Sequence, residues 1–333
     1  MSIRRPQGEG SPDVSILLPV LDEVGTIDAC LRSLTSQDHE GPVEIVVADG
    51  GSTDGTLEAL EKWVERGVTV IHNPDRRQGP GLNRAAAASQ GGILLRADAH
   101  TIYPPDYVAS SVRALAETGA TAVGGSLRPE GVSLFGKAVA AAMQSPLTTG
   151  PAKFHRPESS GAVDTVYLGA FAREDFERLG GFRSFPSGAG EDADFYFRMR
   201  RAGGRVVLVP SIRSIYRPRE RPGSLLRQHF RYGQAKAEML WANGILPSWR
   251  PIPPIGLVAG LVTGAVLAVS GTWWPLVVLA GLWAGVLTLA ALPTGHLAPG
   301  VAFAAALMHL GYGFGFWWGL VRGRGWIRRA RRP

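Results

Sequence analysis

The sequence predicts an α/β protein in which a helix-flanked sheet precedes a region of membrane helices. From residue 14 to residue 98, short apolar runs with strand character alternate with segments of helical periodicity. From residue 251 to residue 321 there is no Asp, Glu, Lys or Arg. Alternating strands and helices form a parallel sheet covered on both faces, and a long stretch without charge suits a bilayer core. The 333 residues therefore form two chemically different parts.

The first part contains four predicted strands joined by helices. An apolar strand is expected at residues 14–20, followed by a helix that Thr26 caps. Further strands are expected at 43–48, 68–71 and 93–97, and further helices after the turn at 50–55 and at 82–89. Because a helix lies between successive strands, the strands should run parallel.

Acidic residues follow three of these strands. Asp22 and Glu23 come after the first strand, Asp49 after the second and Asp98 after the fourth. Each alone is also an ordinary turn residue, and Asp54 is equally a helix cap. Since ligands of such sheets bind outside the carboxyl ends of the strands, the carboxylates together predict a binding site at that edge.

Two common nucleotide-binding folds are excluded by their missing glycine motifs. The first strand is followed by Pro19-Val20-Leu21-Asp22-Glu23 instead of Gly-x-Gly-x-x-Gly, and Gly-x-x-x-x-Gly-Lys-Ser/Thr occurs nowhere. A dinucleotide-dependent dehydrogenase and a P-loop enzyme therefore both lack their central feature.

The charge-free region divides into three apolar segments, at 255–272, 275–292 and 301–321. Each has about the 17–25 residues that cross a hydrocarbon core. A buried hairpin of a soluble protein is the alternative, but three consecutive segments rich in Gly, Leu, Val and Trp favour membrane helices. Three crossings would separate two basic flanks, so one segment is expected not to cross, most naturally within the pair linked at 271–275.

The net charge of +7 is concentrated at the end of the chain. The tail from 322 to 333 carries Arg322, Arg324, Arg328, Arg329, Arg331 and Arg332. Nucleic acid is one partner for such a tail, but directly after an apolar segment it is better read as a cytoplasmic stop on anionic headgroups. Cys30 stands alone, which excludes an internal disulfide, and residues 1–12 lack the apolar core of a signal peptide. We expect residues 1–12 to be disordered, the first part to be cytosolic, and nucleic acid not to be a partner.

Five motifs in sequence carry a family resemblance. They are Pro19 with Asp22-Glu23, Ala48-Asp49-Gly-Gly-Ser-Thr-Asp54-Gly, Asp98-Ala99-His100, Gly180-Gly181-Phe182 with Glu191-Asp192, and Gln228-x-x-Arg231-Tyr232. Over about residues 13–235 the chain resembles family 2 glycosyltransferases of the GT-A fold, a Rossmann-like mixed sheet flanked by helices. The segments 96–100, 166–171 and 230–233 are most similar to succinoglycan-type exopolysaccharide transferases.

The resemblance implies a catalytic domain at 13–223. With the composition, this divides the rest of the chain into an amphipathic interfacial helix region at 224–250, transmembrane helices at 251–321 and a basic cytoplasmic tail at 322–333. It also implies inverting transfer of a sugar from a nucleotide diphosphate sugar, with a UDP-sugar favoured. Mg²⁺ or Mn²⁺ would then offset the charge that develops on the departing diphosphate.

The metal would be held by Asp98, according to the resemblance. The usual Asp-x-Asp is here Asp-Ala-His, so the second ligand is open: His100 coordinates the metal, hydrogen-bonds a phosphate, or is only a turn residue.

Further substrate contacts are carried over from the family. Glu23 and Asp49, with Pro19 and Asp22, would bind the nucleoside through hydrogen bonds. Asn83 would add a nucleotide contact, whereas Arg77 is equally a nucleotide contact or a solvated loop charge.

The catalytic base would be Asp192, next to Glu191, because inversion requires a carboxylate that takes the proton of the acceptor hydroxyl. The glycine-rich stretch 187–190 before it is expected to be mobile. Without the resemblance, Glu191 and Asp192 read as acids that complement a helix N-terminus.

Gln228, Arg231 and Tyr232 lie in an amphipathic stretch, 225–241, that suits a helix on the membrane interface. Arg231 would neutralise the donor diphosphate. Processive synthases end this motif in Trp, so Tyr232 favours addition of a single sugar.

The expected acceptor is a polyprenyl-diphosphate-linked glycan at the cytoplasmic face of the cell membrane. Two alternatives stay open: transfer to a membrane lipid such as a polyprenyl phosphate or diacylglycerol, and a non-catalytic membrane scaffold that binds nucleotide sugars.

Overall fold

The computed structural model describes residues 13–156 and 158–330, with side chains as far as 323. The predicted disordered residues 1–12 and the last three residues of the predicted tail lie outside the described residues. The chain separates into two compact units. The first unit contains residues up to 128, Lys153–Ser184 and Glu191–Tyr216, and the second contains Pro129–Ala152, Phe185–Gly190 and the residues from Arg217 onward.

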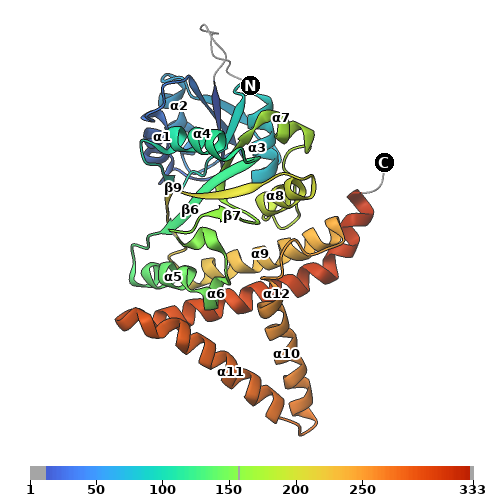
Figure 1. Cartoon of the computed structure of the whole chain (residues 1–333). Helices are drawn as coiled ribbons and strands as arrows, with labels where there is room; N and C mark the ends of the chain where they lie inside the picture. The colour runs from blue at the N-terminus through green and yellow to red at the C-terminus, as the bar shows by residue number, and fades with distance from the viewer. Residues whose placement is uncertain (1–12, 157, 331–333) are drawn as a thin grey trace. The chain divides into compact units, whose positions relative to one another are not determined.

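The first unit is built on one mixed sheet (Figure 1). Its strands are β1 (Val14–Val20), β2 (Val43–Asp49), β3 (Thr69–His72), β4 (Ile93–Arg96), β5 (Thr101–Ile102), β6 (Ala122–Pro129), β7 (Gly161–Ala162), β8 (Tyr167–Ala172) and β9 (Val206–Tyr216). Their order is β3-β2-β1-β4-β8-β6-β9-β5, and β7 pairs with β9. The strands β3, β2, β1 and β4 run parallel, whereas β8 is antiparallel to β4 and to β6. The predicted fold class, a Rossmann-like mixed sheet flanked by helices, is confirmed.

Helices cover both faces of this sheet. They are α1 (Ile27–Thr35), α2 (Thr56–Val64), α3 (Gln78–Ala87), α4 (Tyr107–Thr118), α7 (Arg173–Arg178) and α8 (Glu191–Arg201), with a short 3₁₀ turn at Lys153–His155. Successive side chains of a strand point to opposite faces. Ile16 and Leu18 of β1 therefore pack with α1, α2 and α4, while Leu17 packs with α3, α7 and α8.

Two local predictions differ from the structure. The helix expected at 82–89 begins earlier, at Gln78, with Pro80 in its first turn. Proline is tolerated there because the first amides of a helix have no partner within it. Thr26 does precede α1, but its hydroxyl donates to the Glu23 carboxylate at 2.7 Å instead of capping the helix.

An aromatic cluster joins α8 to the sheet. The Phe195 ring lies 4.7 Å from Phe182 and 5.0 Å from Phe171, centroid to centroid. In the next turn of α8, Arg198 bonds the buried Asp194 at 2.7 Å and donates to the Gly181 carbonyl at 2.6 Å. Packing and charge thus fix the Gly-Gly-Phe turn against the start of α8.

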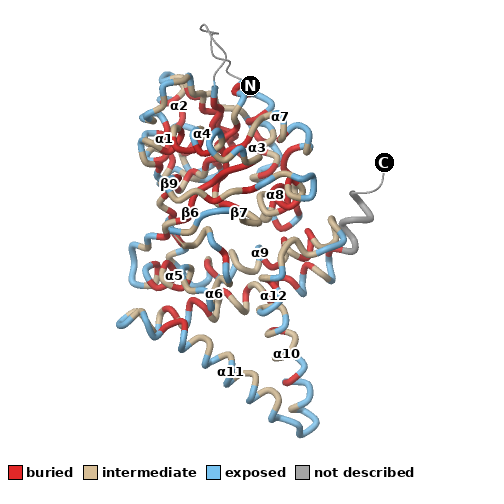
Figure 2. Tube along the Cα trace, in the orientation of Figure 1, coloured by how far each residue is buried: buried red, intermediate tan, exposed pale blue. Residues whose placement is uncertain are grey.

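The second unit is helical. Its helices are α5 (Leu134–Gln144), α6 (Pro146–Thr149), α9 (Pro222–Asn243), α10 (Ile252–Val269), α11 (Trp274–Ala291), the 3₁₀ turn η2 (Leu292–Leu297) and α12 (Ala298–Ala330). Along α10 and α11 most residues are exposed or intermediate (Figure 2). Two stretches, Ile252–Val269 and Trp274–Gly323, are long and apolar enough to cross a membrane, judged by length and composition. The three predicted apolar segments correspond to α10, α11 and α12, and α12 continues into the predicted tail.

The stretch 187–190, expected to be mobile, is anchored to α9 within this unit. The buried Glu238 carboxylate accepts bonds from the Ser187 amide at 3.1 Å and from the Ser187 hydroxyl at 2.6 Å. Gly190 passes so close to Ala235 that a β-carbon at Gly190 would lie 2.9 Å from the Ala235 methyl.

The aromatic cluster gives a stability prediction. Phe195→Ala should destabilise the protein by about 3–5 kcal/mol, because it removes a fully buried ring and leaves a cavity. The melting temperature of the detergent-solubilised full chain is the measurement. Leu57→Ala, at a half-exposed position of α2, is the control and should shift the melting temperature little. Equal shifts in the two variants would contradict the packing described.

Candidate active site

The loops that follow β1 and β2 are bonded to each other. The Asp22 amide donates to the Ser52 hydroxyl at 2.9 Å, and the Thr53 amide donates to the Asp22 carboxylate at 2.8 Å. The Glu23 amide donates to the Thr56 hydroxyl at 2.8 Å. Asp22 takes a left-handed backbone conformation with φ 54°, which Asp tolerates better than most residues. The two loops thus form one connected edge.

Asp49 shapes its own loop. Its buried carboxylate accepts bonds from the Gly51 amide at 2.7 Å and from the Ser52 amide and hydroxyl at 3.1 and 2.6 Å. These bonds are those of an ordinary Asp turn. A nucleoside contact by Asp49 stays a prediction, as it does for Pro19, which lies in β1 beside α3.

Asp98 and His100 follow β4 and lie beside Glu23. His100 Nε2 is 3.8 Å from Asp98 Oδ2, and His100 Nδ1 is 3.3 Å from Glu23 Oε1. Within the described part of the chain, no three His, Cys, Asp or Glu side chains are grouped to hold a metal. A carboxylate with an imidazole nevertheless suits Mn²⁺ in chemistry. The donor atoms of Asp98 and His100 are therefore chemically compatible with a divalent cation.

Arg96 joins the end of β4 to the start of α8. Its Nη2 lies 3.2 Å from Glu191 Oε1, and its Nη1 lies 3.5 Å from Asp192 Oδ2. The two carboxylates differ in access, because the Glu191 side chain is 7% exposed and the Asp192 side chain 35%. Glu191 is therefore an interior partner of Arg96, and Asp192 is the carboxylate that a substrate can reach.

Gln78, the first residue of α3, completes this cluster. With its amide oriented to satisfy both neighbours, its nitrogen donates to Glu191 Oε1 at 3.0 Å and its oxygen accepts from Arg96 Nη2 at 2.9 Å. Burial raises the pKa of the Glu191 carboxyl to about 7, against the opposing attraction of Arg96. The N-terminus of α8 also favours negative charge at this point.

The structure brings the predicted carboxylates to one edge of the sheet. Asp49 is the register partner of Val20, and Arg96 that of Leu17, so the ends of β2 and β4 flank the end of β1. Glu23 contacts His100 across this edge, and Arg96 reaches Asp192.

Two predicted nucleotide contacts have structural partners in the first unit. Asn83 bonds both ways to Phe182, donating to its carbonyl at 2.8 Å and accepting from its amide at 2.9 Å. Arg77 is exposed, and its guanidinium lies 3.5 Å from the Ser184 hydroxyl. Asn83 supports the Gly-Gly-Phe turn, and its contact with a nucleotide stays a prediction.

Gln228, Arg231 and Tyr232 belong to the second unit, on α9. Arg231 is exposed and Tyr232 is 42% exposed, with its ring against His229. Their predicted role at the donor diphosphate stays a prediction.

The sequence did not predict that Arg96 and Gln78 contact the carboxylates at the start of α8. Arg96 lies in an apolar strand. Because a buried charge requires a partner of opposite charge, its position alone indicates a buried ion pair. Gln78 has no such signal, because it precedes what looks like a Gly-Pro-Gly turn.

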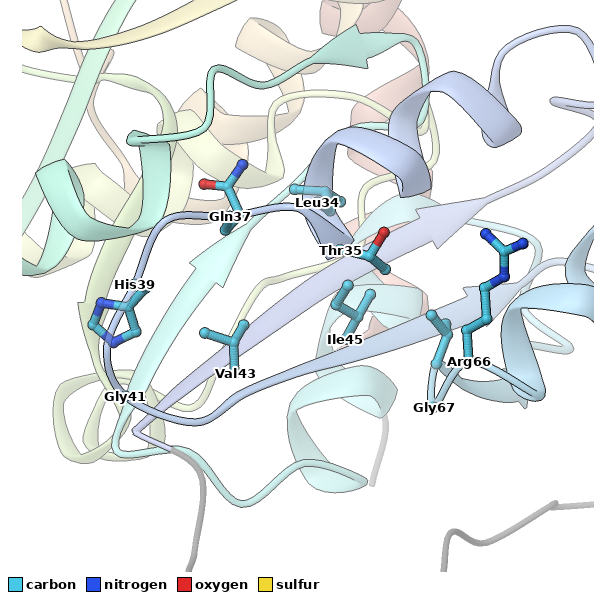
Figure 3. Close-up of a pocket in the computed structure, with 10 residues that line it drawn as sticks. Leu34, Thr35, Gln37, His39, Gly41, Val43, Ile45, Arg66 and Gly67 are labelled. Carbon is cyan, nitrogen blue, oxygen red and sulfur yellow. The ribbon is translucent and has the colours of Figure 1, made fainter.

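A hollow of about 220 Å³ lies at the opposite edge of the sheet (Figure 3). It is lined by Val43 and Ile45 from the start of β2 and by the ends of α1 and α2, including Gln37 and Arg66. These are the amino ends of the strands, where ligands of such sheets do not usually bind. The hollow is therefore distinct from the carboxylate edge.

Comparisons with known proteins identify the family. A model described as Glycosyl transferase family 2 matches residues 15–180. The chain is 34% identical over 313 residues to the succinoglycan biosynthesis protein ExoA of Rhizobium meliloti (strain 1021), covering 91% of this chain and 93% of the relative. The chain belongs to glycosyltransferase family 2. The resemblance to succinoglycan-type transferases of that family is confirmed.

Two more distant proteins resemble this family 2 glycosyltransferase. A Methanococcus voltae enzyme, named dolichyl N-acetyl-alpha-D-glucosaminyl phosphate 3-beta-D-2,3-diacetamido-2,3-dideoxy-beta-D-glucuronosyltransferase, is 22% identical over 68% of this chain and 74% of its own. The mannosyltransferase PcManGT of Pyrobaculum calidifontis, solved with GDP-Man and Mn²⁺, superimposes with a TM-score of 0.64. It is 23% identical, over 93% of this chain and 88% of its own, and supports the fold.

The raised pKa of Glu191 predicts a pH dependence of stability. Its folded pKa of about 7 exceeds its ordinary value of 4.5, so the folded state binds the proton more tightly. This stabilisation is complete below pH 4.5 and is lost as pH rises through about 7, up to about 3 kcal/mol at 1.36 kcal/mol per unit.

Glu191→Gln should therefore lose less stability than the wild type when the pH rises from 5 to 8. Melting temperatures of the solubilised proteins across this range measure it. The exposed Glu58→Gln variant should follow the wild type. Parallel curves for Glu191→Gln and the wild type would mean that Glu191 has an ordinary pKa.

Proposed function

We propose that this glycosyltransferase moves one sugar, with inversion, from a nucleotide diphosphate sugar to a polyprenyl-diphosphate-linked glycan. The lipid-linked glycan would be an intermediate in the synthesis of an exopolysaccharide or of another component of the cell envelope. The observation that carries the proposal is the accessible Asp192 carboxylate, which lies 3.5 Å from the Arg96 guanidinium. Arg96 is two residues before Asp98 in the sequence.

Asp192 acts as the general base in this proposal. The acceptor hydroxyl donates its proton to Asp192 as its oxygen attacks the anomeric carbon from the face opposite the diphosphate, so the configuration inverts. The buried Arg96, 3.5 Å from the more exposed Asp192 carboxylate, would fix its orientation. Glu191 is buried and supports this pair instead of contacting the acceptor.

The donor diphosphate would bind at the loop after β4. Asp98, with His100, would hold Mg²⁺ or Mn²⁺, which supplies Lewis-acid stabilisation to the departing nucleotide diphosphate. Glu23, 3.3 Å from His100, orients the imidazole. The ordered loops at Asp22 and Asp49 are where the nucleoside would bind.

The names of relatives support the acceptor class. One relative acts in succinoglycan biosynthesis, and another has a dolichyl phosphate in the name of its acceptor. The apolar helices of the second unit would keep the enzyme at the cytoplasmic face of the membrane, where such lipid carriers are reached. The proposed reaction does not involve nucleic acid as a partner.

Replacement of the base gives the direct test. Asp192→Asn should lower kcat by about 10²–10⁴-fold, the usual contribution of a general base, while donor binding is retained. Radiolabelled transfer from UDP-, GDP- and dTDP-sugars and thermal shifts by these donors with Mn²⁺ measure the two effects. Asp38→Asn, exposed and remote in sequence from every motif, is the matched control. Near-normal turnover of Asp192→Asn would refute the assignment.

Replacement of Asp98 and His100 separates the roles of these residues. Asp98→Asn should abolish the thermal shift that a nucleotide sugar produces only with Mn²⁺, because the cation loses its carboxylate. If His100→Ala keeps that metal-dependent shift, His100 is a turn residue and not a ligand. A metal-dependent shift that survives in Asp98→Asn would remove Asp98 from the metal site.

The acceptor is tested on the reaction product. A glycan on polyprenyl diphosphate should enter organic solvent and be released by mild acid, whereas a diacylglycerol glycoside resists mild acid. Failure of transfer and hydrolysis with every donor would favour a nucleotide-sugar-binding scaffold.

A further inference from the structure

Helix α12 presents a row of glycines to helix α9. The row, hereafter the glycine ridge, consists of Gly311, Gly315, Gly319 and Gly323, spaced four residues apart on one face. A β-carbon on any of them would collide with α9: with the Leu226, Phe230 and Gln234 carbonyl oxygens and with the Trp241 ring, respectively. The two helices therefore touch closely along these four positions, where the absence of a side chain permits the approach.

The pairing keeps α12 parallel to α9. Residue numbers rise together along both helices, from Leu226 beside Gly311 to Trp241, whose indole nitrogen donates to the Leu320 carbonyl at 3.2 Å. Figure 1 shows the two helices running alongside each other. The shared length covers most of α9.

The first half of α12 packs against another helix outside the apolar region, α5. The Phe303 and Phe135 rings are 6.2 Å apart, and His309 Nε2 lies 3.2 Å from the Thr148 carbonyl just beyond α5. Helix α12 is thus accompanied by α5 and then by α9 through most of its length.

The companion helix α9 cannot enter the hydrocarbon core. It carries Arg227, Arg231, Lys236 and Glu238 over the stretch that contacts the glycine ridge. Charges at the centre of a bilayer are costly and rare. If α12 crossed the membrane, this stretch of α9 would have to cross with it.

Helices α10 and α11 contact α12 without a charged helix beside them: Gly313 of α12 packs on Val258 of α10, and the Trp283 indole of α11 donates to His309 of α12 at 3.3 Å. They contact each other near their shared turn, with Gly264 against Leu276 and Gly260 against Leu279, and diverge away from it (Figure 1). Each has 18 residues, about 27 Å of helix, close to the thickness of a hydrocarbon core. The turn between them exposes Trp273 and Trp274, at 63% and 62%, as expected for aromatic residues at a far interface.

We propose that the chain crosses the membrane twice, by α10 and α11, and that α12 lies along the membrane surface against α9. The end of the chain then returns to the side on which residue 217 lies. The proposal rests on the membrane attachment proposed above and not on the transfer reaction. The sequence led us to expect that one of the two segments linked at 271–275 does not cross the membrane. In this proposal the segment that does not cross is α12.

The other face of α12 fits the headgroup layer of an anionic bilayer. Phe314, Trp317, Trp318 and Val321 form an exposed apolar row at helical spacing. The Arg322 guanidinium lies over the Trp318 ring at 4.2 Å. Aromatic rings beside a basic residue are typical of helices that lie in the interface.

Cysteine labelling tests the topology. Thr272→Cys, Asp38→Cys and Pro333→Cys would each be treated with a membrane-impermeant maleimide on sealed right-side-out vesicles and again after permeabilisation. The wild type is the blank, because its Cys30 is buried. We expect Thr272→Cys to react in sealed vesicles, and the other two to react only after permeabilisation. Reaction of Pro333→Cys in sealed vesicles, or none of Thr272→Cys, would overturn the proposal.

A pair of glycine variants tests the contact itself. Gly315→Leu should separate α12 from α9 and lower the melting temperature by several degrees, whereas Gly285→Leu, with open space around it on α11, should not. Equal melting temperatures would overturn the pairing. The labelling pattern needs no enzymatic activity, so an inactive protein with the expected pattern would count against the proposed reaction alone.

Discussion

The guanidinium of Arg96 is buried at the end of β4, and a buried charge is stable only with opposite charge and hydrogen bonds around it. Glu191, Asp192 and Gln78 supply these partners. This requirement brings the start of α8 to the end of the strand that precedes Asp98, although about a hundred residues separate them in sequence. Removal of one partner would leave an uncompensated charge, so the cluster is a folding constraint and, in the proposed function, also a support for the Asp192 carboxylate.

The carboxylates at this edge of the sheet are of two kinds, buried and more exposed. Asp49 and Glu191 are buried and have their oxygens engaged by neighbouring groups, which fixes loops and charges. Asp98 and Asp192 are more exposed, and the proposed function assigns them to the metal and to the acceptor. A site made in this way separates the groups that must stay rigid from those that must bind and release a substrate.

The parallel strands and their helices could be predicted, because apolar runs that end in Asp are a local pattern. The early start of α3 could not, since Gly79 and Pro80 suggest a turn and only packing decides otherwise. The contact between Arg96 and Glu191 is long-range, and no local pattern specifies which buried acid meets which base. Asn83 illustrates the same limit, because a motif position cannot reveal that its amide is bonded to the Phe182 backbone. The glycine ridge was visible in the sequence, but its partner helix was not.

The bond between Glu238 and Ser187 has a mechanical consequence. Only Gly188, Ala189 and Gly190 lie between Ser187 and Glu191, and both glycines have positive φ, 68° and 83°. Any displacement of α9 must be absorbed in these three residues or passed to the first turn of α8. In the proposed membrane setting, a lipid-driven movement of α9 would reach the start of α8 through this short link.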